Sequence, residues 1–167
     1  MRHIISILVE NQFGVLARVS GLFSARGYNI DSLCVAETED PAVSRMTVVV
    51  RGDNRVLAQI EKQLKKLVET IGVEDLTGVA HVERELIMVR VQAKGKKRSE
   101  VIEIANIFRA KVVDLSPDSI VIEATGSAGK IKAFIDMMHP FGIEELVRTG
   151  KIAIGRSLNN NNEAKGK

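Results

Sequence analysis

The sequence predicts an α+β fold of two tandem ferredoxin-like (βαββαβ) domains, each an antiparallel sheet with both helices on one face. Strand-like and helix-like segments follow one another as strand, helix, strand, strand, helix, strand, and the second half repeats that order. The short connections favour antiparallel neighbours within each half. We therefore expect domains at residues 1–79 and 80–156, followed by a polar, disordered tail at 157–167.

The first half begins with a continuous apolar run, His3 to Val9, which is typical of a strand covered on at least one face. A helical stripe starts at Val15 and continues through Val19 and Phe23, and Gly27 is placed to end this helix. The remaining elements are strands at 30–37 and 44–51, a helix capped by Asp53 that carries Val56, Ile60, Leu64, Leu67 and Ile71 and ends at Gly72, and a weak strand at 73–79.

The second half repeats these signals after a connection near residues 79–83. Serine residues precede both predicted helices, and serine is a favoured helix N-cap. The elements are a strand at 85–93, a helix capped by Ser99, strands at 111–115 and 119–125, a helix capped by Ser127 and ended by Pro140 and Gly142, and a final hairpin of 143–148 with 151–154.

Composition indicates an ordinary globular protein, with 45% apolar and 27% charged residues. The net charge of +3 is spread along the chain, so a polyanion is not the expected partner; the basic cluster Lys94 to Arg98 is interpreted as a solvated loop, with an anion site as the alternative. The single cysteine, Cys34, is expected to be a small buried apolar residue and excludes an internal disulfide, which agrees with a reducing cytoplasm. The N-terminal apolar run is too short for a membrane span or secretory signal, so no membrane association is expected.

Catalytic and nucleic-acid-binding patterns are not found in the sequence. His3, His81 and His139 are far apart in the chain, and none has a neighbouring nucleophile or carboxylate in a recognisable catalytic arrangement. RNA-recognition domains share the same order of elements, but they stack bases on sheet aromatics. The strands at 3–9 and 44–51 contain no aromatic residue, so we expect no nucleic-acid partner.

The segment between the first strand and the first helix can present backbone donors to a ligand. A helix N-terminus carries unpaired amides and the positive end of the helix dipole, and Gly14 leaves space for an anionic group to approach them. Asn11 could add a side-chain amide. The alternative is that Asn11 and Gly14 only form a turn.

Three stretches of the chain carry a more specific signal. They read ILVENQFGVLARVSGLFSARGYNIDSL at 7–33, SRMTVVV at 44–50 and EREL at 83–86. Together they resemble the bacterial regulatory (small) subunits of acetohydroxyacid synthase, also called acetolactate synthase, over nearly the whole chain up to the tail. The N-terminal half resembles an ACT domain, a ferredoxin-like module that binds amino acids.

This resemblance implies a regulatory role without chemistry on this chain. In the family, the large subunit carries thiamine diphosphate, magnesium and FAD and forms 2-acetolactate from pyruvate in branched-chain amino-acid biosynthesis. The small subunit activates it and confers feedback inhibition, usually by valine, so the implied partners are the large subunit, valine and a second copy of this chain. An ACT-type sensor for another enzyme, or a transcriptional regulator, is the alternative.

The resemblance also implies a ligand site shared between two protomers. The carboxylate of valine would meet the loop after the first strand, and its ammonium group would meet the start of the second strand of the partner subunit. The residues carried over are Asn11, Gly14, Val15 and Leu16 for the carboxylate, Asn29 of the partner subunit for the ammonium group, and Ile30, Val35 and Ala36 for the side chain. The last three are equally consistent with ordinary core packing.

Two features limit this transfer. Phe13 lies inside the loop and could either cover the ligand or pack on the partner chain. The second half has Ala93 to Arg98 in place of the loop motif, so no second valine site is expected there.

Overall fold

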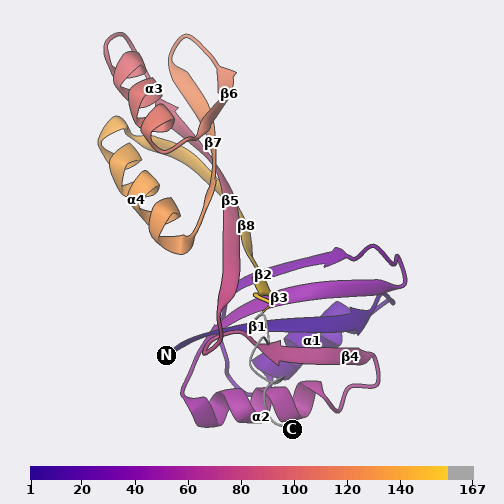
Figure 1. The fold of residues 1–167 in the computed structure, drawn as a ribbon. Coiled ribbons are helices and arrows are strands. Elements are labelled where there is room, and N and C mark those ends of the chain that lie inside the picture. Colours follow the sequence, from indigo (N-terminus) through magenta and orange to yellow (C-terminus); the bar gives the residue numbers. More distant parts are fainter. Residues whose placement is uncertain (158–167) are drawn as a thin grey trace, which may run out of the picture.

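The computed structural model describes residues 1–157, which form two four-stranded antiparallel sheets, each with its helices on one face (Figure 1). The two sheets have equivalent strand orders, β2-β3-β1-β4 and β6-β7-β5-β8. The predicted pair of ferredoxin-like domains is therefore confirmed. The tail predicted to be disordered lies, from residue 158 onward, outside the described residues.

The first domain contains the elements predicted for the first half. Ile5, Ile7 and Val9 alternate along its central strand and are fully buried on the face that the helices cover. The elements are β1 (Arg2–Glu10), α1 (Val15–Ser24), β2 (Ile30–Glu37), β3 (Val43–Arg51), α2 (Asn54–Leu64) and β4 (Thr70–Asp75). Gly27 ends α1 as predicted: its φ is +69°, and the Tyr28 amide after it donates to the Phe23 carbonyl at 3.0 Å.

The second domain packs α3 and α4 on its own sheet around a separate apolar core. Phe134 of α4 is fully buried there and contacts Phe108 edge to face, with ring centroids 5.4 Å apart. The elements are β5 (His81–Gln92), α3 (Lys97–Ile107), β6 (Lys111–Leu115), β7 (Ser119–Gly126), α4 (Ala128–Met138), a 3-10 turn (His139–Phe141) and β8 (Ile143–Gly155).

The predicted hairpin at the end of the chain is wrong, because β8 is one continuous strand. It pairs with β5 on both sides of Thr149 and Gly150, where two residues of β8 face Leu86 alone and form a β-bulge. Gly150 takes a φ of +82°, so the glycine that suggested a turn instead permits this bulge.

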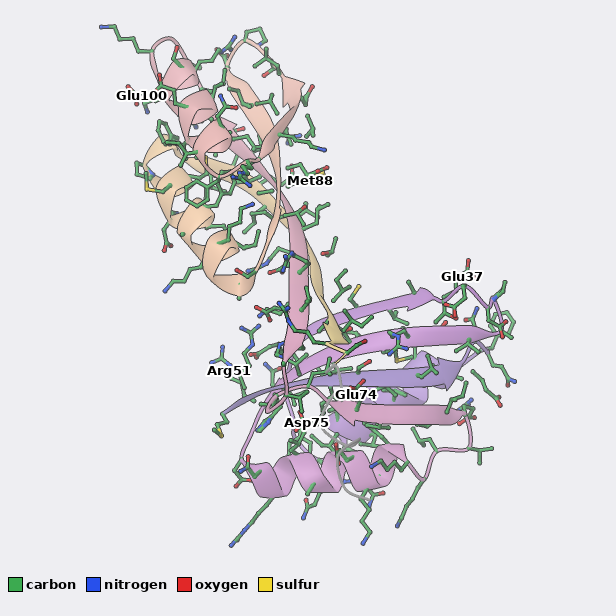
Figure 2. The ribbon with its side chains drawn as sticks, in the orientation of Figure 1. Glu37, Arg51, Glu74, Asp75, Met88 and Glu100 are labelled. Carbon is green, nitrogen blue, oxygen red and sulfur yellow. The ribbon has the colours of Figure 1, made fainter. Side chains whose placement is uncertain are left out.

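The paired strands β5 and β8 extend beyond the second sheet and reach the open face of the first sheet (Figure 1). There Ala153 packs with Ile4, Val49 and Leu76 in a small apolar cluster. Glu74 and Asp75, at the end of β4, lie beside the tip of this ribbon (Figure 2). The domains therefore meet along a narrow seam.

Two helix boundaries differ from the predictions. Helix α2 ends at Leu64 rather than Gly72, because Gly72 and Val73 pair with Leu8 and Ile7 of β1 and belong to β4. Sheet pairing thus overrides the apolar helical spacing that included Leu67 and Ile71.

The serine caps also differ. Ser99 lies within the first turn of α3, which begins at Lys97. Ser127 holds the N-cap position of α4, but its hydroxyl makes no capping bond; the Ala128 amide donates instead to Glu83 Oε1 at 3.1 Å.

Candidate functional site

The loop from Asn11 to Gly14 joins β1 to α1 and is held at both flanks by backbone bonds. The Glu10 amide donates to the Glu69 carbonyl at 2.9 Å, and the Asn11 amide donates to the Ala42 carbonyl at 2.7 Å. Gly14 occupies the N-cap of α1 with a φ of 81°, in the left-handed region that favours glycine. The loop is therefore fixed between the β2–β3 turn and the start of β4.

This geometry leaves backbone donors free at the start of α1. Among residues 1–157, the amides of Gly14 and Leu16 meet no hydrogen-bond acceptor, whereas the Val15 amide reaches the Gln12 carbonyl at 3.4 Å. The positive end of the helix dipole adds to these donors. These unpaired donors and the positive helix end are features that favour a carboxylate. The carboxylate site itself stays a prediction.

Arg18 is a cation at this loop that the sequence analysis did not include in the site. A Cβ added to Gly14 would lie 3.2 Å from Nη1 of Arg18, and Nη2 of Arg18 pairs with Glu69 at 2.5 Å. Its position one helical turn after Gly14 was the available signal in the sequence. The guanidinium adds positive charge beside the free amides.

A hollow of about 370 Å³ opens next to the loop and has an apolar floor. Val9, Val15 and Met46 are buried beneath it, while Leu16 and Val35 form half-exposed walls. The other lining residues are Glu10, Asn11, Gln12, Ala36, Glu37 and Ser44. A small ligand with an aliphatic part and a charged head matches this combination.

The structure brings together five of the eight predicted site residues around this hollow: Asn11, Val15, Leu16, Val35 and Ala36. Gly14 is in the adjoining loop. Asn29 and Ile30 do not line the hollow, because they lie at the opposite end of β2 from Val35 and Ala36. Ile30 instead packs against the first core.

The structure fixes the side chain of Asn11 by a hydrogen bond and leaves that of Phe13 exposed. Asn11 Nδ2 donates to the Pro41 carbonyl at 2.9 Å, so the amide expected to meet a carboxylate already ties the loop to the β2–β3 turn with one of its hydrogens. Phe13 is fully exposed, at 104% of its reference area. Within one protomer, Phe13 therefore does not cover the hollow.

The corresponding loop of the second domain is bridged by Arg98. Its guanidinium donates to the carbonyls of Ala93, Ser116 and Pro117 at 3.3, 2.6 and 2.5 Å. Lys94 pairs with Asp118 at 3.4 Å. Part of the basic cluster thus has a structural role that the sequence analysis did not assign.

The three histidines remain separate. His3 is buried with Nε2 3.1 Å from the Gly52 carbonyl, and His81 Nδ1 lies 2.9 Å from the Val79 carbonyl. Within residues 1–157, no three metal-binding side chains are grouped. In the same part of the chain, no helix has the length and apolar character needed to cross a membrane.

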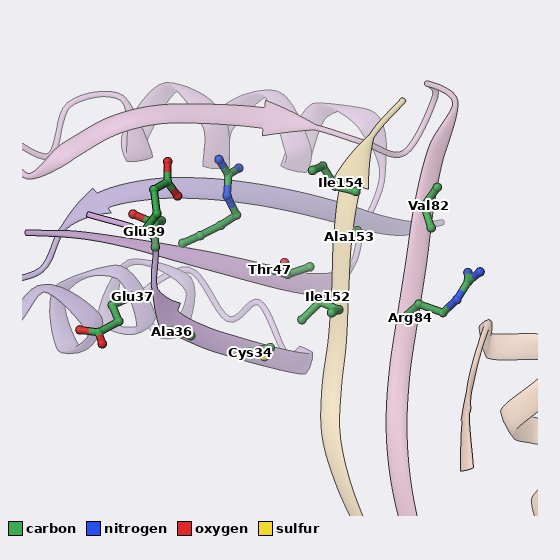
Figure 3. A pocket seen from close by; sticks show the side chains of 12 residues that line it. Cys34, Ala36, Glu37, Glu39, Thr47, Val82, Arg84, Ile152, Ala153 and Ile154 are labelled. Atoms are coloured by element: carbon green, nitrogen blue, oxygen red, sulfur yellow. The ribbon is translucent and has the colours of Figure 1, made fainter. Parts of the chain in front are cut away.

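A second hollow, of about 450 Å³, lies between the open face of the first sheet and the β5–β8 ribbon (Figure 3). Ile152 and Ile154 of β8 and half-buried Cys34 of β2 line it. Ala36 and Glu37 border both this hollow and the one at the loop. The sequence analysis missed it because the ribbon that forms one wall is distant in sequence.

Comparisons with known proteins agree on one family. A model described as the AHAS small subunit-like ACT domain matches residues 5–72, and one described as the small subunit of acetolactate synthase matches residues 84–157. The chain is 56% identical to a probable acetolactate synthase small subunit of Archaeoglobus fulgidus over 93% of this chain and 98% of that protein. It is 47% identical to the acetolactate synthase isozyme 3 small subunit of Escherichia coli, over 93% and 96% of the two chains.

A solved structure shows the same fold over nearly the whole length. The acetolactate synthase small subunit of Thermotoga maritima superposes with a TM-score of 0.86 at 39% identity, covering 93% of this chain and 98% of that one.

Proposed function

The chain belongs to the family of acetolactate synthase small subunits, and from this membership we propose that it activates the large subunit and makes it sensitive to valine. The large subunit performs the chemistry, the formation of 2-acetolactate from pyruvate. We assign thiamine diphosphate, magnesium and FAD to that partner. This chain supplies regulation.

The observation that carries the valine proposal is the combination of free amides and an apolar hollow at one loop. The Gly14 and Leu16 amides and the nearby Arg18 favour the carboxylate of an amino acid. Val15, Leu16 and Val35 surround a space suited to a short aliphatic side chain. Valine has both parts.

The ammonium group of valine requires an acceptor, which we propose comes from a second protomer. Asn29 lies at the far end of β2 from Val35, and residues in a strand rise by about 3.3 Å each. Asn29 of the same protomer is therefore too far from the hollow to reach a ligand there. Strand β2 is an edge of its sheet, so it can meet its counterpart in a homodimer. Asn29 of the partner subunit can then accept from the ammonium group.

Inhibition follows if valine binds better to the arrangement in which the large subunit is less active. A ligand with equal affinity for both arrangements does not shift the equilibrium between them. The coupling free energy between two allosteric sites is typically about 1–3 kcal/mol. A site between two protomers provides such a difference, because ligation changes how they sit against each other.

Reconstitution tests this proposal. The purified large subunit is assayed for acetolactate formation alone, with this chain, and with this chain plus valine; we expect activity to rise and then to fall. An unchanged rate on adding the chain would refute activation. Valine binding to the chain without any effect on the large subunit would favour a sensor for a different client.

A further inference from the structure

The two domains are joined by a polar contact between two β-bulges, one in each sheet. The Lys151 amide, directly after the β8 bulge, donates to Ser32 Oγ at 2.9 Å. Ser32 directly follows the register shift between β2 and β3. A residue at the seam of the first domain is therefore bonded to the backbone of the second.

Gly150 makes this contact close. A Cβ at Gly150 would lie 2.9 Å from Ser32 Oγ and 3.1 Å from the Leu33 carbonyl oxygen, and its φ of +82° also favours glycine. Any larger residue would press the ribbon away from β2. The sequence signal that first suggested a turn thus marks close approach of two backbones.

From Lys151 the contact continues to helix α4. Lys151 Nζ, with its side chain only 5% exposed, lies 2.8 Å from Glu83 Oε2. Glu83 Oε1 accepts the Ala128 amide at 3.1 Å at the start of α4. Burial opposes ionisation of Glu83, but the bonds from Lys151 and Ala128 outweigh it and lower the pKa of this carboxyl.

The apolar contact between the two domains is small. It consists of Ile4, Val49, Leu76 and Ala153. Beside the Ser32–Lys151 bond lies an interdomain hollow of about 880 Å³, whose lining includes the charged side chains of Asp31, Arg51 and Lys132. A small contact beside a large hollow resists rotation less than an extensive apolar interface does.

Both ends of strand β2 carry residues proposed to bind valine, and Ser32 lies between them. Asn29 is three residues before Ser32, and Val35 and Ala36 are three and four residues after it. A shift of β2 on ligation therefore moves Ser32 against the ribbon. One strand, β2, thus spans the distance between the proposed ligand site and the seam.

We propose that Ser32, Gly150 and Lys151 form the coupling contact through which β2 reports valine occupancy to the second domain. This inference rests on the proposed function. Ser32 and Gly150 are positioning residues, because they fix the β5–β8 ribbon against β2. Lys151 and Glu83 extend this contact to the start of α4. Without them, valine binds the chain but acts weakly on the enzyme.

Two variants and two matched controls test the contact. Ser32→Ala removes the acceptor, and Gly150→Ala separates the backbones. Ser20→Ala removes a hydroxyl that donates to the Ala17 carbonyl within α1. Gly142→Ala places alanine at a φ of +86°, where the nearest neighbours of its Cβ would be atoms of the Gln92 side chain, from 3.6 Å. Folding of each variant is checked by circular dichroism.

Each full-length variant is titrated with valine by calorimetry and then assayed with the large subunit. We expect Ser32→Ala and Gly150→Ala to bind valine like the unaltered chain but to lose most of the inhibition at saturating valine, while both controls retain it. Hydrogen exchange at the start of α4 should respond to valine in the controls and not in the two seam variants.

The outcomes separate the two proposals. Full inhibition by valine in both seam variants overturns the coupling contact and leaves the proposed function intact. Absence of valine binding to the unaltered chain overturns the proposed function itself.

Discussion

Arg148 holds the carboxylate of Glu85 with two parallel hydrogen bonds, Nε to Oε1 at 2.8 Å and Nη2 to Oε2 at 2.7 Å. Glu85 is 4% exposed, whereas the Arg148 side chain is half-exposed. The hydrogen bonds that Arg148 donates to Glu85 raise the pKa of the guanidinium, although burial opposes its charge. The pair spans β5 and β8 beside the bulge.

Arg148→Ala is expected to destabilise the second domain, because it leaves a buried carboxylate without its cation. The cost should be about 3 kcal/mol, at the lower end of the range for breaking buried pairs, since water reaches the arginine side. Denaturant titration measures the free energy of unfolding. The control is Arg90→Ala, which breaks an exposed 2.6 Å pair with Glu145 and should cost less than about 1 kcal/mol. Equal losses in both variants would contradict this account.

Gly14→Asp is expected to weaken valine inhibition while sparing activation. The new carboxylate would occupy the space in front of the free amides, repel the ligand carboxylate and strain a backbone with a φ of +81°. The matched control is Gly95→Asp in the corresponding loop of the second domain, where φ is +55° and a Cβ would have nothing within 4 Å. The measurement is the valine concentration that halves the activity of the reconstituted enzyme. Unchanged sensitivity in Gly14→Asp would argue against this loop as the site.

Glu83 is expected to make stability depend on pH in the acid range. Burial raises the pKa of Glu83, but the Lys151 and Ala128 bonds and the charge of Arg2 lower it below 4.5 overall. A lowered folded-state pKa means that the stabilisation is present above about pH 4.5 and is lost as pH falls through the folded value.

Unfolding curves of the unaltered chain and Glu83→Gln, recorded from neutral to acid pH, test this expectation. The difference in stability should be largest near neutral pH and should shrink in acid. Glu103→Gln on the exposed face of α3 is the control and should show no such trend. A difference that stays constant through the acid range would show that the charge of Glu83 is not the cause.

Phe13→Ala is expected to weaken association between protomers without destabilising the monomer fold. The side chain is fully exposed in one chain, so its loss should change the free energy of unfolding by no more than ~0.5 kcal/mol. Sedimentation across a range of concentrations measures the dimer dissociation constant. Ile107→Ala, at a position 77% exposed on the second domain, is the control for lost apolar surface. Identical dimer dissociation constants for the two variants would show that Phe13 does not contribute to the interface between protomers.

Local patterns in the sequence determined the order of the elements and much of the candidate loop. The apolar run of β1, the stripe of α1 and the cap at Gly27 depend on interactions between residues close in the chain, so periodicity reveals them. Gly14 before α1 and the free amides of Gly14 and Leu16 follow from the same local geometry. Repetition of the order in the second half then predicted two equivalent sheets.

Tertiary structure alone decided where long-range pairing overrides these patterns. Gly72 is a strand residue because β4 meets β1, and Gly150 is a bulge because β8 continues along β5 to the first domain. Glu83 caps α4 from 45 residues away, and Lys151 bonds Ser32 across 119 residues. Such contacts depend on which distant segments become neighbours, and the hydrophobic period of each segment carries no information about its neighbour in space.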